Sequence, residues 1–234
     1  MVLAHTVSMA NVLSETQVTA YDTDGYVFPI PALSGDEVAR CRAGLEQYEA
    51  SVGHPIEFPE KSKSYLLFDW ADELVHHPKV LDAVESECPP KAGPVRIIPG
   101  SHRLGQFEHG DDPGQWNMIK RGQGIFDQFK DDDGVLMPLR SGEMSLHHTD
   151  VVHSSTGNNA ADRRIGIGIS YIPTRVRPLG DIKPSALLGR GTDTYGHFVE
   201  EDRLVEQQSP EALAAHVEAN RLFRARQDAG ASLS

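Results

Sequence analysis

GEMSLHHTDVVHSSTGNNAADRRIGIGISYIP, residues 142–173, is the stretch that decides the predicted fold. It is predicted to form two strands joined by a polar loop, because its middle is rich in the Ser, Gly, Asn and Asp residues that form turns. The first strand covers roughly Glu143–His153. Its alternation places His147, Thr149, Val151 and His153 on one face. The second strand covers roughly Arg164–Ile172.

The second predicted strand separates its side chains by type. One face carries Ile165, Ile167, Ile169 and Tyr171, which we expect to be buried against a hydrophobic layer. The other face carries Gly166, Gly168 and Ser170, which leave empty volume, and Arg164 adds a fixed positive charge at its end. This pattern predicts the wall of a small pocket for an anionic ligand.

Outward from this stretch, the chain of 234 residues is predicted to be a single domain. We divide it into an N-terminal helical and edge-strand region (1–87), a β core (94–174), and a C-terminal extension and helix (175–234). Capping boxes at Ser14 with Gln17 and at Ser34 with Glu37 predict two N-terminal helices. Further predictions are a helix from Pro78, short strands at 94–98 and 135–139, and a helix from Ser209-Pro210 to about Gln227.

The formal net charge of −12 argues against nucleic acid or an anionic membrane surface as the main partner. No apolar run approaches the roughly 20 residues of a membrane span, and no signal peptide is recognisable. Cys41 and Cys88 form no metal-type spacing and suggest no disulfide scaffold, so a cytoplasmic location is expected. The polar residues 103–134 form a long excursion of the kind that is usually functional or mobile.

Several motifs together resemble the phytanoyl-CoA dioxygenase-like family. They are DGYVFPI from Asp24, HPKVLDAVE from His77, VRIIPGSHRLGQ from Val95, GEMSLHHTDVVHSSTGN from Gly142, RRIGIGISYIPTRVR from Arg163 and LLGRGTDTYGHF from Leu187. The resemblance covers most of the chain. It implies a mainly β fold with flanking helices, in which the core is a double-stranded β-helix of the jelly-roll or cupin-like type. It also implies an Fe(II)- and 2-oxoglutarate-dependent dioxygenase that hydroxylates a small organic substrate.

The resemblance assigns roles to three residues. His153 matches the distal histidine of the family's iron site of two histidines and one carboxylate, a ligand set that leaves positions open for cosubstrate and oxygen. Arg164 matches the arginine that pairs with the remote carboxylate of 2-oxoglutarate, for which a planar guanidinium is well suited. Ser155 matches a hydroxyl that helps to hold the same carboxylate.

The chain departs from the family where the other two iron ligands should lie. The family places a His-x-Asp pair between the helix that ends near Glu87 and the strand that begins near Pro94. Here the interval contains only SECPPKAG, residues 86–93, without histidine or aspartate. Part of the core is therefore absent from the sequence. We predict a discontinuity between Glu85 and Ala92, visible as a Cα step longer than the roughly 3.8 Å of a trans peptide. An unbroken step would favour a true deletion.

Other histidines are weaker candidates. His148-Thr149-Asp150 spells His-x-Asp, but in a continuous strand His148 and Asp150 face away from His153. His147 shares the face of His153, yet six residues of strand would separate the two by roughly 20 Å. A second functional hypothesis is a degenerate, non-catalytic jelly-roll protein that binds a small carboxylate or a partner. A third, weaker one is a cupin-like enzyme with another metal. The sequence does not determine the substrate or the oligomeric state.

Overall fold

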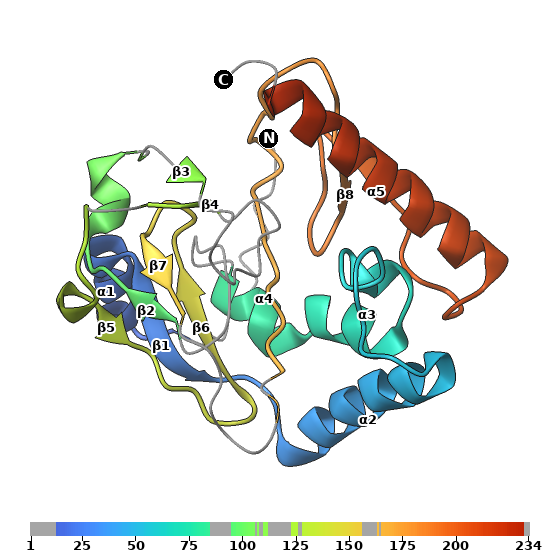
Figure 1. Ribbon diagram of the computed structural model, residues 1–234, viewed down its shortest axis with the longest axis horizontal. Coiled ribbons are helices and arrows are strands. Elements are labelled where there is room, and N and C mark those ends of the chain that lie inside the picture. Colours follow the sequence, from blue (N-terminus) through green and yellow to red (C-terminus); the bar gives the residue numbers. More distant parts are fainter. Residues whose placement is uncertain are drawn as a thin grey trace, which may run out of the picture. The chain divides into compact units, whose positions relative to one another are not determined.

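The computed structural model describes residues 13–84, 95–105, 107, 110–111, 123–125, 128–155, 163 and 165–231 (Figure 1). The chain forms two compact units, each assembled from two separate segments. Unit 1 contains residues up to 32 and the described part of 83–171, and unit 2 contains 33–82 and 172 onward. The single-domain organisation stays a prediction. In the part of the chain that is described, no helix is both long and apolar enough to cross a membrane.

Unit 1 combines small antiparallel sheets with short helices. Strand β1 pairs with β6, β2 lies between β5 and β7, and β3 pairs with β4. The elements are α1 (Glu15–Asp24), β1 (Tyr26–Pro31), the end of α4 (Pro78–Val84), β2 (Arg96–Ile97), η2 (Ser101–Leu104), β3 (Gly110–Asp111), β4 (Gln123–Gly124), η3 (Asp131–Asp133), β5 (Val135–Leu136), β6 (Glu143–His147) and β7 (His153–Ser154).

The first helix begins and ends as the sequence predicts. The Ser14 hydroxyl accepts a hydrogen bond from the Gln17 backbone N–H, and the Gln17 side chain accepts one from the Ser14 N–H. The helix ends at Gly25, whose φ of 83° lies in the left-handed region that glycine adopts at low cost. Its N–H donates to the Tyr21 carbonyl at 2.8 Å. The chain can therefore turn directly into β1.

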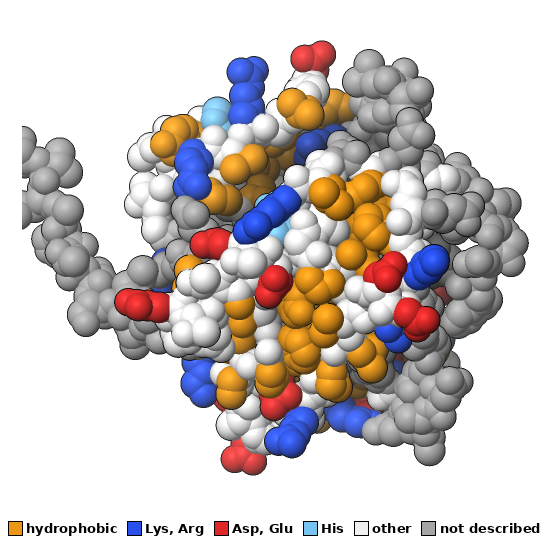
Figure 2. Space-filling view, turned by 90° about the vertical axis from the view of Figure 1, so that its left-hand side faces the viewer, with side chains coloured by type: hydrophobic (Ala, Val, Ile, Leu, Met, Phe, Trp, Pro, Cys, Tyr) orange, Lys and Arg blue, Asp and Glu red, His pale blue; other side chains and the backbone are white. Residues whose placement is uncertain are grey.

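Two hydrophobic clusters hold the sheets of unit 1. One packs α1 and β1 onto β6 through residues that include Tyr21, Ile30 and Leu146. The other surrounds β2 and includes Ile97, Met137 and Val151. The edge strand β5 remains partly uncovered, since Val135 is 39% and Leu136 is 49% exposed. The face that Figure 2 presents carries hydrophobic side chains with acidic and basic side chains interspersed.

Unit 2 is mostly helical. It contains α2 (Gly35–Val52), η1 (Ser64–Leu66), α3 (Asp69–Val75), the first residues of α4, β8 (Ser185–Leu187), β9 (Val199–Glu201) and α5 (Pro210–Ala231). The capping box of Ser34 and Glu37 at the start of α2 is confirmed. The Ser34 backbone N–H and hydroxyl donate hydrogen bonds to the Glu37 carboxylate. These bonds, followed by one from His77, lower the pKa of Glu37 to about 2. Leu67, Phe68 and Ala71 form the core with Tyr48 and Trp70 against them. Strands β8 and β9 pair in parallel.

Two strand predictions are wrong. The predicted strand 143–153 is two strands, β6 and β7, separated by a turn. Residues 165–172 have no strand structure, and Ile165 and Ile167 are 37% and 38% exposed rather than buried. A strand exists only where a neighbouring strand accepts its hydrogen bonds, and the part of the chain that is described provides none for this segment. The combination of small antiparallel sheets with helices is confirmed, whereas the closed double-stranded β-helix stays a prediction.

Candidate metal and cosubstrate site

The break between β6 and β7 brings two histidines together. His147 ends β6 opposite Tyr26 of β1, whereas His153 begins β7 opposite Ile97 of β2. In the intervening turn, the Val151 N–H donates to the His148 carbonyl at 3.1 Å. The imidazole centroids of His147 and His153 are therefore 5.5 Å apart, with an interplanar angle of 45°. The expected separation of roughly 20 Å is wrong because it assumed a continuous strand.

The tautomer of His153 is fixed by its own turn. Its Nδ1 lies 2.9 Å from the Val151 carbonyl oxygen. A carbonyl oxygen can only accept a hydrogen bond, so Nδ1 carries the proton and Nε2 of the neutral ring has a lone pair available. Metal-binding histidines are commonly oriented in this way, with the second ring nitrogen donating to a backbone carbonyl. His153 lies on the exposed strand β7, where Nε2 can reach a ligand.

The spacing of the two rings suits a shared ion. Two imidazoles that bind one divalent ion through nitrogens about 2.1 Å from it place their centroids roughly 4.5–5.5 Å apart at bond angles of about 90–115°. The observed 5.5 Å lies at the upper end of that range. His147 is only 2% exposed, whereas β7 is exposed, so an ion here would lie at the edge of the core of unit 1. The sequence placed both histidines on one face, but it did not predict their proximity.

The rest of an iron site is not found among the described residues. Within them, no group of three or more His, Cys, Asp or Glu side chains is placed to hold a metal. The described residues thus fit two imidazole ligands and do not fit a complete set of two histidines and a carboxylate. The interval 85–94, with its predicted discontinuity, lies outside the described residues, as does Arg164. Ser155 directly follows β7, two residues after His153, and it is exposed.

His148 and Asp150 have a local structural role. The Asp150 backbone N–H donates to His148 Nδ1 at 3.1 Å, and the His148 N–H donates to the Gly25 carbonyl at 2.7 Å. The His148 ring also lies against His102, with centroids 5.3 Å apart. These contacts join the turn to the end of α1. His148 and Asp150, which spell His-x-Asp, therefore stabilise the turn between β6 and β7 that brings His147 beside His153.

Two partly buried tyrosines of unit 1 have raised pKa values. Tyr26, the cross-strand neighbour of His147, has a pKa raised by burial and further by the Asp24 carboxylate. Burial also raises the pKa of Tyr171 in the same unit. Both phenols are therefore protonated at neutral pH and can donate hydrogen bonds.

A family model and several solved structures show which known proteins this chain is similar to. Residues 81–166 match the family model described as phytanoyl-CoA dioxygenase. The solved structure of apo ThoJ, a non-heme monooxygenase, is 26% identical with a TM-score of 0.74 over 91% of this chain and 99% of that chain. The ThoJ–Ni complex is 24% identical, with a TM-score of 0.70 over 91% and 98%. CytC3 with Fe(II) and α-ketoglutarate is 18% identical, with a TM-score of 0.50 over 83% and 94%. No curated protein sequence matches the chain.

Proposed function

Because this chain belongs to the phytanoyl-CoA dioxygenase-like family of oxygenases, we propose that it is an Fe(II)- and 2-oxoglutarate-dependent oxygenase that hydroxylates a small organic substrate. The observation that carries the proposal is the pair His147 and His153, which lies inside the matched residues with ring centroids 5.5 Å apart. The nickel bound by ThoJ and the Fe(II) and α-ketoglutarate bound by CytC3 support a metal and an oxoacid as ligands.

The residues of the chain have separate roles in this proposal. His153 holds the metal through Nε2, in the orientation set by the hydrogen bond from Nδ1 to the Val151 carbonyl. His147 is the second imidazole, in place of the histidine that the family provides from its His-x-Asp pair. Arg164 and Ser155 hold the remote carboxylate of the oxoacid. Fe(II), when bound, would activate dioxygen. The described residues do not supply the remaining carboxylate ligand.

The alternative function is a non-catalytic protein that binds a small carboxylate, and the missing His-x-Asp pair favours it. Turnover separates the two functions. With Fe(II), ascorbate and 2-oxoglutarate under air, we expect the purified chain to form succinate above the level of a metal-free control containing a chelator. The test measures uncoupled turnover, in which 2-oxoglutarate is converted to succinate without hydroxylation of a substrate. The unknown substrate is therefore not needed. Saturable binding of 2-oxoglutarate without any Fe(II)-dependent succinate would favour the binding protein instead.

Arg164→Ala is expected to remove most of the affinity for 2-oxoglutarate. A charge-assisted, bidentate pair in a partly dry pocket is worth about 2–3 kcal/mol, which corresponds to a loss of roughly 30- to 150-fold. Isothermal calorimetry with 2-oxoglutarate measures the change. Arg163→Ala is the matched control, because it removes the same charge from the adjacent position. Equal affinities in the wild type and Arg164→Ala would show that Arg164 does not hold the cosubstrate.

A further inference from the structure

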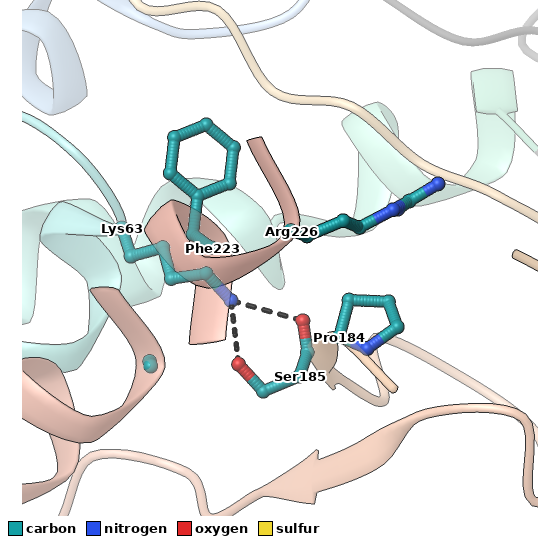
Figure 3. A pocket seen from close by; sticks show the side chains of 6 residues that line it. Lys63, Pro184, Ser185, Phe223 and Arg226 are labelled. Atoms are coloured by element: carbon teal, nitrogen blue, oxygen red, sulfur yellow. Dashed lines mark hydrogen bonds between the residues drawn. The ribbon is translucent and has the colours of Figure 1, made fainter. Parts of the chain in front are cut away.

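Unit 2 contains a pocket of about 250 Å³ that the proposed oxygenase site does not use (Figure 3). Three elements form its walls: Lys63 directly before η1, the start of β8, and one face of α5. Its volume lies below the range typical of pockets for drug-sized molecules, which selects for a small ligand. The lining residues are Lys63, Pro184, Ser185, Ala219, Phe223 and Arg226.

One stripe of α5 provides most of the apolar wall. Ala219, Phe223 and Arg226 follow one another at spacings of four and three residues, so they share a face of the helix. Ala219 is buried and small, which leaves room beside it, while Phe223 is 43% exposed. Together with Pro184, these side chains offer an apolar surface. A hydrophobic ligand body could cover the exposed Phe223 ring.

The opposite wall is fixed by Lys63. Its ammonium group donates to the Ser185 carbonyl oxygen at 3.0 Å and to the Ser185 hydroxyl at 3.1 Å, and it pairs with the Glu201 carboxylate. These three acceptors use all three ammonium N–H groups. Lys63 also has a φ of 52°, a left-handed conformation that costs energy for a residue other than glycine. The wall is therefore preformed, and Lys63 has no donor left for a ligand.

Arg226 differs from the other arginines of its helix. Arg224 lies over the Phe58 ring at 4.6 Å, and Arg221 pairs with Glu218 at 2.7 Å. No hydrogen bond or ion pair to another described residue engages the Arg226 guanidinium. Figure 3 shows this side chain extending past Pro184, away from the contact between Lys63 and Ser185. Arg226 is nevertheless one of the residues that line the pocket, and its side chain is exposed.

We propose that this pocket binds a small amphipathic monocarboxylate, with its apolar body against Phe223 and Pro184 and its carboxylate on Arg226. A guanidinium forms bidentate hydrogen bonds with a carboxylate. One carboxylate is sufficient because Lys63 is already saturated by Ser185 and Glu201. The site lies wholly within unit 2 and does not depend on the proposed metal site.

Phenylacetate is the probe, and its binding to the metal-free wild-type chain is measured by calorimetry. An acid of about ten non-hydrogen atoms should bind with a dissociation constant on the order of 1 mM or below. We expect Arg226→Gln to weaken binding at least tenfold. Arg224→Gln is the matched control, since it removes the same charge from the same helix outside the pocket, and it should retain the wild-type affinity.

The neutral analogue phenylacetamide completes the test. It has the same apolar body without the negative charge, so we expect at least tenfold weaker binding than that of phenylacetate. Three outcomes would overturn the proposal. They are no saturable binding of phenylacetate to the wild type, equal losses in the Arg224 and Arg226 variants, and equal affinity for the acid and the amide.

Discussion

Replacing Glu201 by alanine is expected to lower the free energy of unfolding by about 3–5 kcal/mol, because it removes one partner of a buried ion pair. The Glu201 side chain is 6% exposed and its partner Lys63 is 16% exposed. The same carboxylate accepts a hydrogen bond from the Tyr65 hydroxyl at 2.7 Å. Burial and then the neighbouring carboxylate raise the Tyr65 pKa, so the phenol stays protonated as a donor. The substitution leaves a partly buried cation and a partly buried hydroxyl without this acceptor.

Urea unfolding of the wild type and the variant measures this loss. Glu200→Ala is the matched control, because Glu200 precedes Glu201 on β9 and is exposed. We expect the control to change stability by less than about 0.5 kcal/mol. Lys63→Met and the double variant complete a mutant cycle, in which the coupling between Lys63 and Glu201 should exceed about 1 kcal/mol. Equal stabilities of the two single glutamate variants would refute the network.

The parts of the fold set by local chemistry could be predicted from the sequence. Ser14 with Gln17, and Ser34 with Glu37, each satisfy backbone donors within three residues, so the sequence alone indicates where α1 and α2 begin. Pro78 and Pro210 likewise occupy first helical positions. These signals depend on neighbours along the chain. These signals therefore indicate helix starts independently of the tertiary structure.

The turn between β6 and β7 could not be predicted from alternation alone. The apolar and polar residues of 143–153 alternate as in one strand, yet the His148 N–H bonds to Gly25, more than a hundred residues earlier. Thr149-Asp150 was the one local signal for a turn.

The pocket beside α5 could not be predicted either, because Lys63 pairs with Glu201 across 138 residues of sequence. Contacts of this range depend on the whole fold.

The second large effect is expected at the histidine pair. His153→Ala should weaken the binding of a divalent transition metal by at least about a hundredfold, since even the loss of a residue that only orients a ligand costs 10- to 100-fold. His147→Ala should have a similar effect if both rings share the ion. His54→Ala is the control, because His54 is an exposed histidine of unit 2, whereas both histidines of the pair belong to unit 1. Equilibrium dialysis measures the affinities, and Fe(II)-dependent succinate formation should decline in the same order.

The proposed oxygenase site requires that His147 and His153 hold the metal together. Long-range ¹H–¹⁵N spectra of the imidazole side chains during addition of Zn(II) test it most directly. Zn(II) binds imidazole and has no redox chemistry, so it reports ligation alone. The chain has 11 histidines, and the two signals are assigned with the single-alanine variants. We predict that the His147 and His153 resonances shift together and saturate at one equivalent of Zn(II). A shift of His153 without His147, or saturation of other histidines first, would contradict the claim.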